Sequence, residues 1–510
     1  MYDNHSHEQE AGMRHVRAVG MACVAGALVL LGGCTGGKQG NELTVLIRMM
    51  PAQQRFFRDE IVKAFEKEHK CKINIATFNN EWDIERMLKL EAGKNDPEIG
   101  LVKTPFEMTR VLVAKGYMQK LADIVDSSQV MQDIAEYHPL ATALGMVDEV
   151  PYYIPRKLET RILFYRKSKV AEAVAKFPQH RSRINAELKK RNGYGLPKGY
   201  ALEEQPGEWD FYDLFVVGTI WANEEYNGVK VGRMAHRGAR YGGTALFLVD
   251  RAIQLGADED DLMRLTGDKT TEMYLWENML VQSGTYNPGM WQDPWKGSNI
   301  YNGIKDGKVF LAYLQQIDCF LVHGWKEDPG MPTYLPDIDD MGLSVVPRAV
   351  SFTMTKGDPS YEGGRRISTG GWWWGVPKTS PDAELAYAFA RFVTNKENQA
   401  RECAKFGMIP VRKDILSNLP EVFDEGWVGD IFEVSIDQIR TQFESEDIVT
   451  VPLNKYYSQI AQNMVEAWYK LCVDYNEDEQ GTIDLATMKM RLGSDFVPKQ
   501  KEILGDAYPE

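Results

Sequence analysis

Short apolar segments alternate with amphipathic ones from residue 41 onward. Three segments are brief and β-rich, whereas the stretches between them repeat apolar residues at helical spacing. Strands are expected at 42–47, 72–77 and 97–102, and helices at 57–65, 84–92 and 107–115. This β-α-β-α-β-α order predicts a doubly wound α/β sheet. A second α/β region starts near Arg156, with strands expected at 160–165, 308–314 and 342–346 and an apolar helix at 246–255.

The loops after the first three strands carry the first candidate binding residues. Ligands of such sheets bind at the carboxyl ends of the strands, so the loops at 48–53, 79–82 and 103–106 share one rim. The candidates are Arg48, Trp82, Lys103 and Thr104. Each has a structural alternative: a surface salt bridge for Arg48, core packing for Trp82, and capping of the next helix for Thr104.

The N-terminal segment has the pattern of an export signal. Arg14 and Arg17 precede an apolar run at 18–31, which is too short to span a membrane at about 20 residues. The sequence Leu-Gly-Gly-Cys34 follows and resembles a bacterial lipobox. We expect a lipoprotein-type signal peptide at 1–33, lipidation of Cys34 and a tether at 34–40. The alternative is an ordinary signal peptide with an incidental cysteine.

Charge and composition exclude several classes of protein. The chain has 73 acidic and 59 basic residues, and its net charge of −14 disfavours a nucleic-acid or anionic-membrane partner, which needs a basic surface. A charged fraction of 26% is too high for a polytopic membrane protein. Besides Cys34, four cysteines lie after the expected signal peptide, and they either pair or remain as buried thiols: Cys71, Cys319, Cys403 and Cys472.

Sequence motifs for catalysis and metal binding are missing. There is no GxxxxGK[ST], HExxH or GxSxG motif, and the eight histidines are scattered singly. The segment 337–342 faintly resembles a calcium loop, but Arg348 stands where the closing glutamate belongs, so a turn is expected. The sequence predicts no catalytic residues, no cofactor and no metal site. A glycosidase stays open as an alternative, because its two carboxylates leave no local signature.

Eight segments, in a fixed order, resemble those of one protein family. They are 61–68 (IVKAFEKE), 92–99 (AGKNDPEI), 115–124 (KGYMQKLADI), 150–167 (VPYY…LFYRK), 208–214 (EWDFYDL), 303–312 (GIKDGKVFLA), 370–378 (GGWWWGVPK) with the helix at 382–393, and 407–412 (GMIPVR). From Leu43 to about Leu471 the chain resembles the bacterial extracellular solute-binding proteins of sugar-type ABC importers, which are maltose-binding-protein-like.

The resemblance implies a periplasmic-binding-protein-like type II fold, in which a hinge joins two doubly wound α/β lobes and a ligand cleft lies between them. We expect lobe 1 at 41–155 and about 370–425, and lobe 2 at about 156–365 and about 430–510. Most members are shorter. The surplus lies mainly in 176–208, 255–290 and the tail after 475, where it is placed to reshape the mouth of the cleft.

The resemblance also implies a function. The protein is expected to be an extracytoplasmic, lipid-anchored and monomeric receptor that binds a mono- or oligosaccharide and delivers it to an ABC permease in the cytoplasmic membrane. It is not expected to be an enzyme. The alternatives are a non-sugar solute, such as an organic anion, polyamine or peptide, and a secreted glycosidase.

A sugar presents hydroxyl edges and apolar faces, so its site needs planar polar groups and aromatic rings. The resemblance and the strand ends add candidates: Glu159, Arg161, Tyr241, Gln315, Asp318, Trp372 and Tyr457. A mutual salt bridge is the alternative for Glu159 and Arg161, a plain turn for Tyr241 and core packing for Tyr457. Rings of the strand 372–374 alternate in direction, and the family register favours Trp372 for the ligand.

Overall fold

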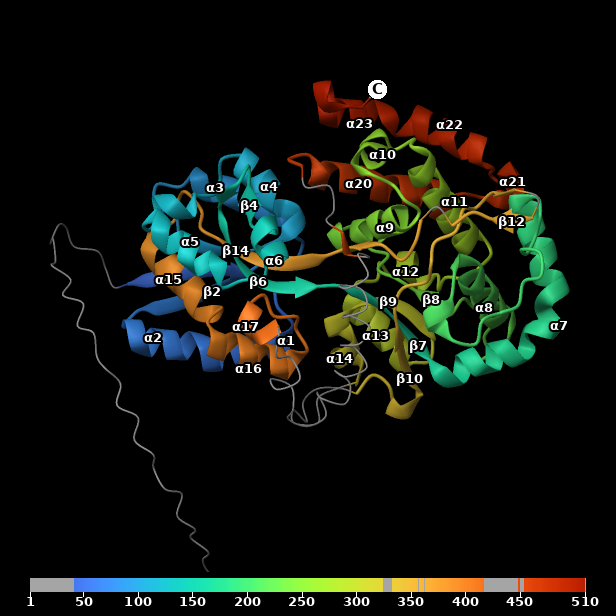
Figure 1. The fold of residues 1–510 in the computed structure, drawn as a ribbon, viewed down its shortest axis with the longest axis horizontal. Coiled ribbons are helices and arrows are strands. Elements are labelled where there is room, and N and C mark those ends of the chain that lie inside the picture. Colours follow the sequence, from blue (N-terminus) through green and yellow to red (C-terminus); the bar gives the residue numbers. More distant parts are fainter. Residues whose placement is uncertain are drawn as a thin grey trace, which may run out of the picture. The chain divides into compact units, whose positions relative to one another are not determined.

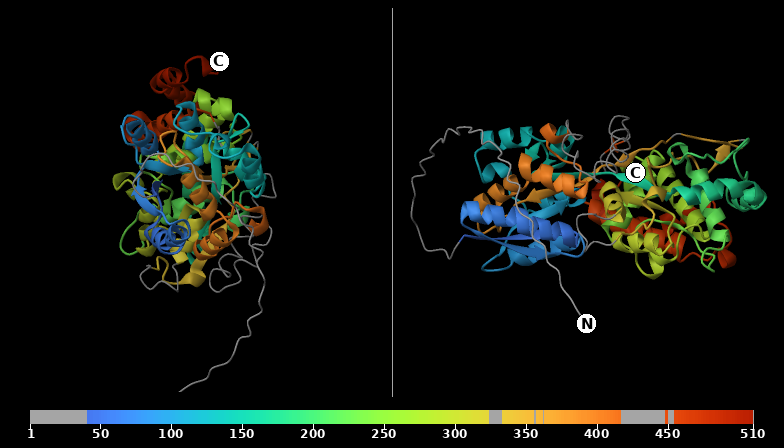
Figure 2. Two further views of the ribbon diagram at one scale, coloured as in Figure 1. Left: turned by 90° about the vertical axis from the view of Figure 1, so that its left-hand side faces the viewer. Right: turned by 90° about the horizontal axis from the view of Figure 1, so that it is seen from below.

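The structure is a computed structural model that describes residues 41–323, 333–355, 357–361, 363–416, 448–449 and 454–509. Residues 41–510 form one compact unit. Its elements gather in two groups, each built on its own sheet, and the right-hand view of Figure 2 separates them clearly. We call them lobe 1 and lobe 2 in chain order. The expected signal peptide, the tether and Cys34 lie outside the described residues.

Lobe 1 is built on a five-stranded sheet with the order β2-β1-β3-β14-β6 (Figure 1). Its strands are β1 (Glu42–Ile47), β2 (Lys72–Thr77), β3 (Ile99–Pro105), β6 (Tyr153–Glu159) and β14 (Gly370–Gly375). Strands β1, β2 and β3 run parallel, as their alternation with helices predicts, whereas β14 lies antiparallel between β3 and β6. The segment that returns from the distant 370s therefore completes the sheet of the first lobe.

Helices pack around this sheet. They are α1 (Pro51–Phe56), α2 (Lys63–His69), α3 (Asp83–Ala92), α4 (Phe106–Ala114), α5 (Ser127–Ala135), α6 (Pro139–Leu144), α15 (Ala383–Val393), α16 (Lys396–Phe406) and α17 (Lys413–Leu416). A π-helical turn at Phe57–Val62 joins α1 to α2. The buried faces of α2 and α15 carry the apolar residues that the sequence spaces at helical intervals, among them Phe65 and Phe389, whose rings meet edge to face at 4.9 Å.

Lobe 2 is built on a four-stranded sheet with the order β10-β7-β9-β8. Its strands are β7 (Arg161–Arg166), β8 (Met234–Ala235), β9 (Leu311–Gln315) and β10 (Met341–Ser344). Its helices are α7 (Lys167–Asn192), α8 (Phe211–Asn223), α9 (Gly242–Gln254), α10 (Glu259–Arg264), α11 (Asp268–Gln282), α12 (Gly289–Gln292), α13 (Gly297–Lys305), α14 (Gln316–His323), α20 (Tyr457–Trp468), α21 (Glu477–Gln480), α22 (Leu485–Asp495) and α23 (Val497–Leu504). The expected turn at 337–342 is a 3-10 turn, Ile338–Asp340, that leads into β10.

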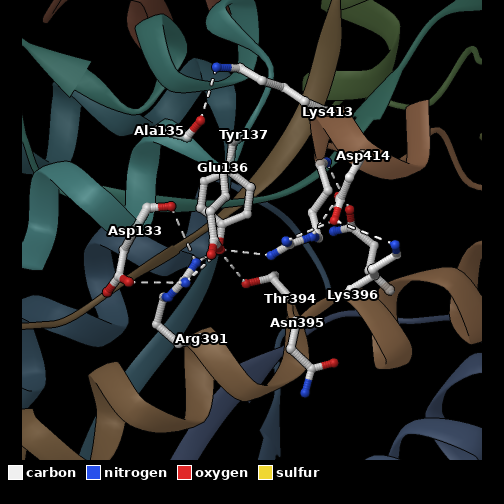
Figure 3. A network of polar contacts seen from close by, with 12 residues as sticks. Asp133, Ala135, Glu136, Tyr137, Arg391, Thr394, Asn395, Lys396, Lys413 and Asp414 are labelled. Carbon is white, nitrogen blue, oxygen red and sulfur yellow. Dashed lines mark hydrogen bonds and ion pairs between the residues drawn. The ribbon is translucent and has the colours of Figure 1, made fainter. Parts of the chain in front are cut away.

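An ion network fastens the returning segment of lobe 1 to the body of that lobe (Figure 3). Arg391 on α15 pairs with Glu136 at 2.7 Å and with Asp133 at 3.1 Å. Arg412 pairs with the same Glu136 carboxylate at 2.8 Å, and Lys413 donates to the Ala135 carbonyl at 2.9 Å. Segments more than 250 residues apart in the chain are thus held together by one set of charges.

Much of the surplus length forms helices. Residues 176–192 complete α7, which buries Phe177, Ile184 and Leu188 and ends at Gly193, a position with a φ of +82° that favours glycine. In the C-terminal tail, α22 packs on α11, and α23 packs on α10 and α20 (Figure 1). Residues 193–205, between α7 and the 3-10 turn Pro206–Glu208, form no helix or strand.

The four cysteines of the described residues are free thiols, and three of them are buried, which agrees with the buried-thiol alternative. Among the same residues, no helix combines the length and the apolar character that crossing a membrane requires.

Candidate functional site

A cavity of about 200 Å³ is lined by residues of both lobes. Lobe 1 contributes residues within 48–53, 103–107, 157–159 and 371–372 together with Glu81, and lobe 2 contributes residues within 237–246, 296–301 and 315–321. The volume is below the range of about 300–1,000 Å³ that is usual for ligand pockets. The cavity therefore suits a small solute.

The topology explains why polar residues meet here. Strands β1, β3 and β9 end beside the cavity, and the helices α4, α9, α13 and α14 begin beside it. The carboxyl ends of strands and the amino ends of helices coincide in this way in α/β folds, so the expectation of a shared rim after β1 and β3 is confirmed.

Most of the predicted site residues line this cavity. They are Arg48, Lys103, Glu159, Tyr241, Gln315, Asp318 and Trp372. Four others do not line it: Trp82, Thr104, Arg161 and Tyr457. Of the three tryptophans of β14, Trp373 and Trp374 are fully buried, whereas Trp372 is partly buried and lines the cavity. Strict alternation would place Trp374 on the same face as Trp372, but the register with β6 shifts between Trp372 and Trp373.

Glu159, the last residue of β6, is held by three donors. The Trp372 indole donates to it at 3.0 Å, the Gln315 amide at 2.8 Å, and Lys157 forms an ion pair with it. Burial would raise the pKa of Glu159, but Lys157 and other cations outweigh that effect and hold the pKa below its ordinary value. Glu159 thus links β14 of lobe 1 to β9 of lobe 2 while remaining charged.

A second cluster comes from lobe 2 alone. Arg237 donates to Asp318 at 2.9 Å and to the Gln315 side-chain oxygen at 3.0 Å. Asp318 also accepts from the Tyr301 hydroxyl and from the Gln315 backbone N–H. These contacts fix the Arg237 guanidinium and the Asp318 carboxylate in place, so this wall offers fixed planar groups to a ligand with adjacent hydroxyls.

A third cluster lies on the rim of lobe 1. Arg48 forms an ion pair with Glu81, as its structural alternative proposed, and it lines the cavity as well. Lys103 donates to the Arg48 carbonyl at 2.6 Å, and its ammonium lies 4.1 Å from the centre of the Trp372 ring. The ring of Trp372 therefore has a cation on one side.

Burial shifts the pKa of Glu107 and of Lys103, which both line the cavity. It raises the pKa of the Glu107 carboxyl to about 8, and the nearby Glu81 and Glu159 carboxylates add to this effect. Burial also lowers the pKa of Lys103 well below its ordinary value, and the cations Arg156 and Lys157 act in the same direction. At neutral pH, Glu107 is therefore mostly protonated and able to donate a hydrogen bond.

The residues outside the cavity have structural roles or lie just behind it. Tyr457 is buried at the start of α20, which agrees with core packing. Thr104 is buried within β3 opposite Trp373 and makes no cap for α4. Trp82 is partly buried, and its indole N–H has no hydrogen-bond partner among the described residues. It faces the start of α9, where a Cβ on Gly242 would lie 3.8 Å from the indole nitrogen.

Arg161 belongs to the hinge rather than to the cavity wall. It does not pair with Glu159. Its guanidinium instead forms a bidentate ion pair with Asp250 of α9, at 2.6 and 2.8 Å. Asp250 also accepts the backbone N–H of Ser368, two residues before β14, at 2.8 Å. The two strands that cross between the lobes, at Thr160 and near Thr369, are thus tied to one carboxylate in lobe 2.

Several cavity residues were missed from the sequence. Arg237 lies in an irregular segment between β8 and α9, where no periodicity points to it. Lys157 and Glu107 lie next to predicted residues, and Tyr301 and Glu81 line the cavity as well. Lys296 precedes Gly297 and Ser298 at the start of α13, a helix-start signal that was available in the sequence.

The arrangement is suited to recognition by hydrogen bonds and ring contacts. Three of its four acidic side chains are each held by a cation, and no group of three or more histidine, cysteine or acidic side chains able to hold a metal occurs in the part of the chain that the structure describes. The site residues thus offer donors, acceptors and aromatic faces to a polar solute.

Comparison with known proteins gives one family match. The model of a family described as bacterial extracellular solute-binding protein matches residues 60–425. A search among curated proteins finds no relative.

Solved structures match over nearly the whole chain. The GacH receptor of Streptomyces glaucescens, solved with acarbose, is 15% identical with a TM-score of 0.63, and the match covers 92% of this chain and 100% of the receptor. The maltose-bound MalE3 of T. maritima is 13% identical with a TM-score of 0.63, covering 89% and 99%. The Thermus thermophilus maltotriose-binding protein is 13% identical with a TM-score of 0.61, covering 91% and 100%. At these identities the matches establish the fold.

Proposed function

The chain belongs to the bacterial extracellular solute-binding proteins, and on that premise we propose that it is the receptor of an ABC importer and binds a carbohydrate in the cavity between its lobes. The observation that carries the proposal is the cavity wall, where fixed planar polar groups surround a partly exposed indole. The hydroxyl edges of a sugar match the planar polar groups, and its apolar face matches the indole ring. The structural neighbours named above are complexes with acarbose, maltose and maltotriose, which supports the same ligand class.

The contacts to the solute would come from the cavity-lining residues predicted from the sequence, together with Arg237, Tyr301 and Lys296. The cavity-lining residues would be held in position by four predicted residues outside the cavity wall: Trp82, Thr104, Arg161 and Tyr457. The crossings at Thr160 and near Thr369 would act as the hinge on which the lobes, divided near 155 and 370, close over the solute and present it to a permease.

The protein is proposed to bind its solute without transforming it, and to act as a monomer. A glycosidase needs a second carboxyl group free to act as nucleophile or base. Glu81, Glu159 and Asp318 are each engaged by a cation, which supports binding over hydrolysis.

Binding is tested by thermal unfolding of the purified protein against a panel of mono- and oligosaccharides. A sugar present at 100 times its dissociation constant is expected to add about 2.7 kcal/mol to the free energy of unfolding. Amino acids and polyamines serve as control solutes. A melting temperature that responds to these controls and to no carbohydrate contradicts the sugar assignment, and chromatographic detection of hydrolysed sugar contradicts the non-enzymatic role.

The family is extracytoplasmic, and we propose that this member is held at the membrane by a lipid on Cys34. The support is the apolar run at 18–31 followed by Leu-Gly-Gly-Cys34. Substitution Cys34→Ala is expected to move the protein from the membrane fraction to the soluble fraction of the extracytoplasmic space, because the acyl chains are lost. An unchanged membrane fraction would exclude the anchor.

A further inference from the structure

The cavity has more cationic than anionic groups. Its basic side chains are Arg48, Lys103, Lys157, Arg237 and Lys296, and its acidic side chains are Glu81, Glu107, Glu159 and Asp318. Three carboxylates are matched one to one, in the pairs Arg48–Glu81, Lys157–Glu159 and Arg237–Asp318. The fourth acid, Glu107, has its pKa raised to about 8 by burial and so adds little negative charge at pH 7. Lys103 and Lys296 are left without a counter-charge.

Neither lysine has a carboxylate partner in the described parts of the chain. Lys103 as a residue is only 3% exposed, and its ammonium donates to a backbone carbonyl and lies over the Trp372 ring. The Lys296 ammonium lies 5.2 Å from the centre of the Tyr241 ring, and no acidic side chain is recorded within ion-pair distance of it among these residues. Burial without a counter-ion disfavours the charged form of Lys103 and lowers its pKa, so an anion that enters the cavity would favour the ammonium and would itself be bound.

The amino ends of four helices also favour an anion in the cavity. Helices α4, α9, α13 and α14 begin at the cavity, and residues from the first turn of each line it, among them Glu107, Gly243, Ser298 and Asp318. The amino end of a helix carries a partial positive charge and free N–H groups. Four such ends around one cavity, added to two unmatched ammonium groups, give it an anion-binding character that a wholly neutral solute would not use.

Each unmatched lysine lies beside an aromatic ring, Trp372 in lobe 1 and Tyr241 in lobe 2. A ligand that matches both the lysines and the aromatic rings is a small molecule with an apolar ring face and an anionic group. We propose that the solute is an acidic sugar, a uronate or short uronide, whose carboxylate is bound by Lys103 and Lys296. This inference rests on the proposed carbohydrate-binding function and narrows it.

The proposal is tested with matched pairs of sugars that differ only at C6. Titration calorimetry on the mature protein compares D-glucuronate with D-glucose, D-galacturonate with D-galactose, and D-mannuronate with D-mannose, with glucose 6-phosphate and citrate as further anions. At least one uronate is expected to bind 100-fold or more tightly than its neutral counterpart. Its affinity is expected to fall as the salt concentration rises.

Variants assign the carboxylate to the two lysines. Lys296→Met and Lys103→Met each remove one charge and keep most of the side-chain length. Each is expected to weaken binding of the uronate by tenfold or more, and to weaken binding of its neutral counterpart by a smaller factor. The matched control is Lys305→Met, an exposed lysine at the far end of α13, which is expected to change neither. Lys296 is part-exposed at a helix start, so its variant is expected to fold even if the Lys103 variant does not.

The outcomes separate the two proposals. Neutral sugars that bind as tightly as their uronates, glucose 6-phosphate that binds in preference to glucuronate, or a uronate preference that survives Lys296→Met, would each overturn the acidic-sugar inference and leave the carbohydrate receptor intact. Binding of citrate with no binding of any sugar, acidic or neutral, would overturn both.

Discussion

Substitution Asp250→Ala is expected to lower the free energy of unfolding by about 3–5 kcal/mol, the usual cost of removing one partner from a buried ion pair. Asp250 accepts both forks of the Arg161 guanidinium at 2.6 and 2.8 Å and the Ser368 N–H at 2.8 Å. All three residues are buried, so the alanine leaves a desolvated cation and an unpaired backbone donor at the crossing between the lobes. Urea denaturation followed by circular dichroism measures the effect.

The matched control is Asp268→Ala, at the start of α11 in the same lobe. Asp268 also pairs with a basic residue, Lys489, but its side chain is 76% exposed, so this change is expected to cost less than about 1 kcal/mol. If the two variants unfold at the same urea concentration, Asp250 does not stabilise the crossing between the lobes. Because Asp250 lies outside the cavity wall, the folded fraction of its variant is expected to keep the wild-type choice of ligand.

The sequence located the strand ends of the cavity well, because a strand is defined by local alternation and its end by the same pattern. Lys103 was placed on the rim and Gln315 was added as a candidate at a strand end. Strand β3 continues to Pro105, three residues beyond its expected end, so Lys103 lies within it, and Gln315 is the last residue of β9. Arg161 shows the limit of this reasoning. It is separated from Glu159 by one residue, and only the packing of α9 decides that its guanidinium turns to Asp250 and not to the cavity.

Local pattern could not assign Arg237 or Lys296 to the cavity. Arg237 lies in an irregular segment between β8 and α9, and the helix-start signal at Lys296 does not show what its side chain faces. Their role arises from long-range contacts: Arg237 meets Asp318, 81 residues later, and Lys296 meets the Tyr241 ring. Residues 176–208, 255–290 and the tail after 475 contribute no residue to the cavity wall. Their packing on neighbouring helices also depends on long-range contacts, which local pattern does not show.

Strand β14, with its three consecutive tryptophans, was the most informative local signal in the sequence. Its geometry makes Trp372 the residue whose substitution is expected to affect binding most. In β14 the register with β6 shifts between Trp372 and Trp373, and Gly371 has a φ of +154°. A Cβ at Gly371 would lie 2.4 Å from the Lys157 carbonyl, so only glycine fits. This local distortion leaves Trp372 at the cavity while its two successors enter the core.

Substitution Trp372→Ala is expected to weaken solute binding by 100-fold or more, which corresponds to about 2.7 kcal/mol. The alanine removes the ring face offered to the sugar, the indole donor to Glu159 at 3.0 Å and the ring beneath the Lys103 ammonium. Calorimetric titration with the tightest sugar of the panel measures the loss. Trp372→Phe keeps a ring but no N–H, so an intermediate affinity is expected.

The control for general loss of an aromatic side chain is Trp291→Ala. Trp291 is also partly buried, packs edge to face against Trp468 at 6.3 Å and lies outside the cavity wall. Its variant is expected to bind the solute as the wild type does. If Trp372→Ala remains folded and binds within threefold of the wild type, the indole is not a ligand platform, and the polar clusters around Glu159 and Asp318 must carry recognition alone. If Trp372→Ala loses affinity and Trp291→Ala does not, the ring contact and the positions of Glu159 and Lys103 contribute to binding together. The Trp372 side chain contacts both residues and also offers its ring to the solute.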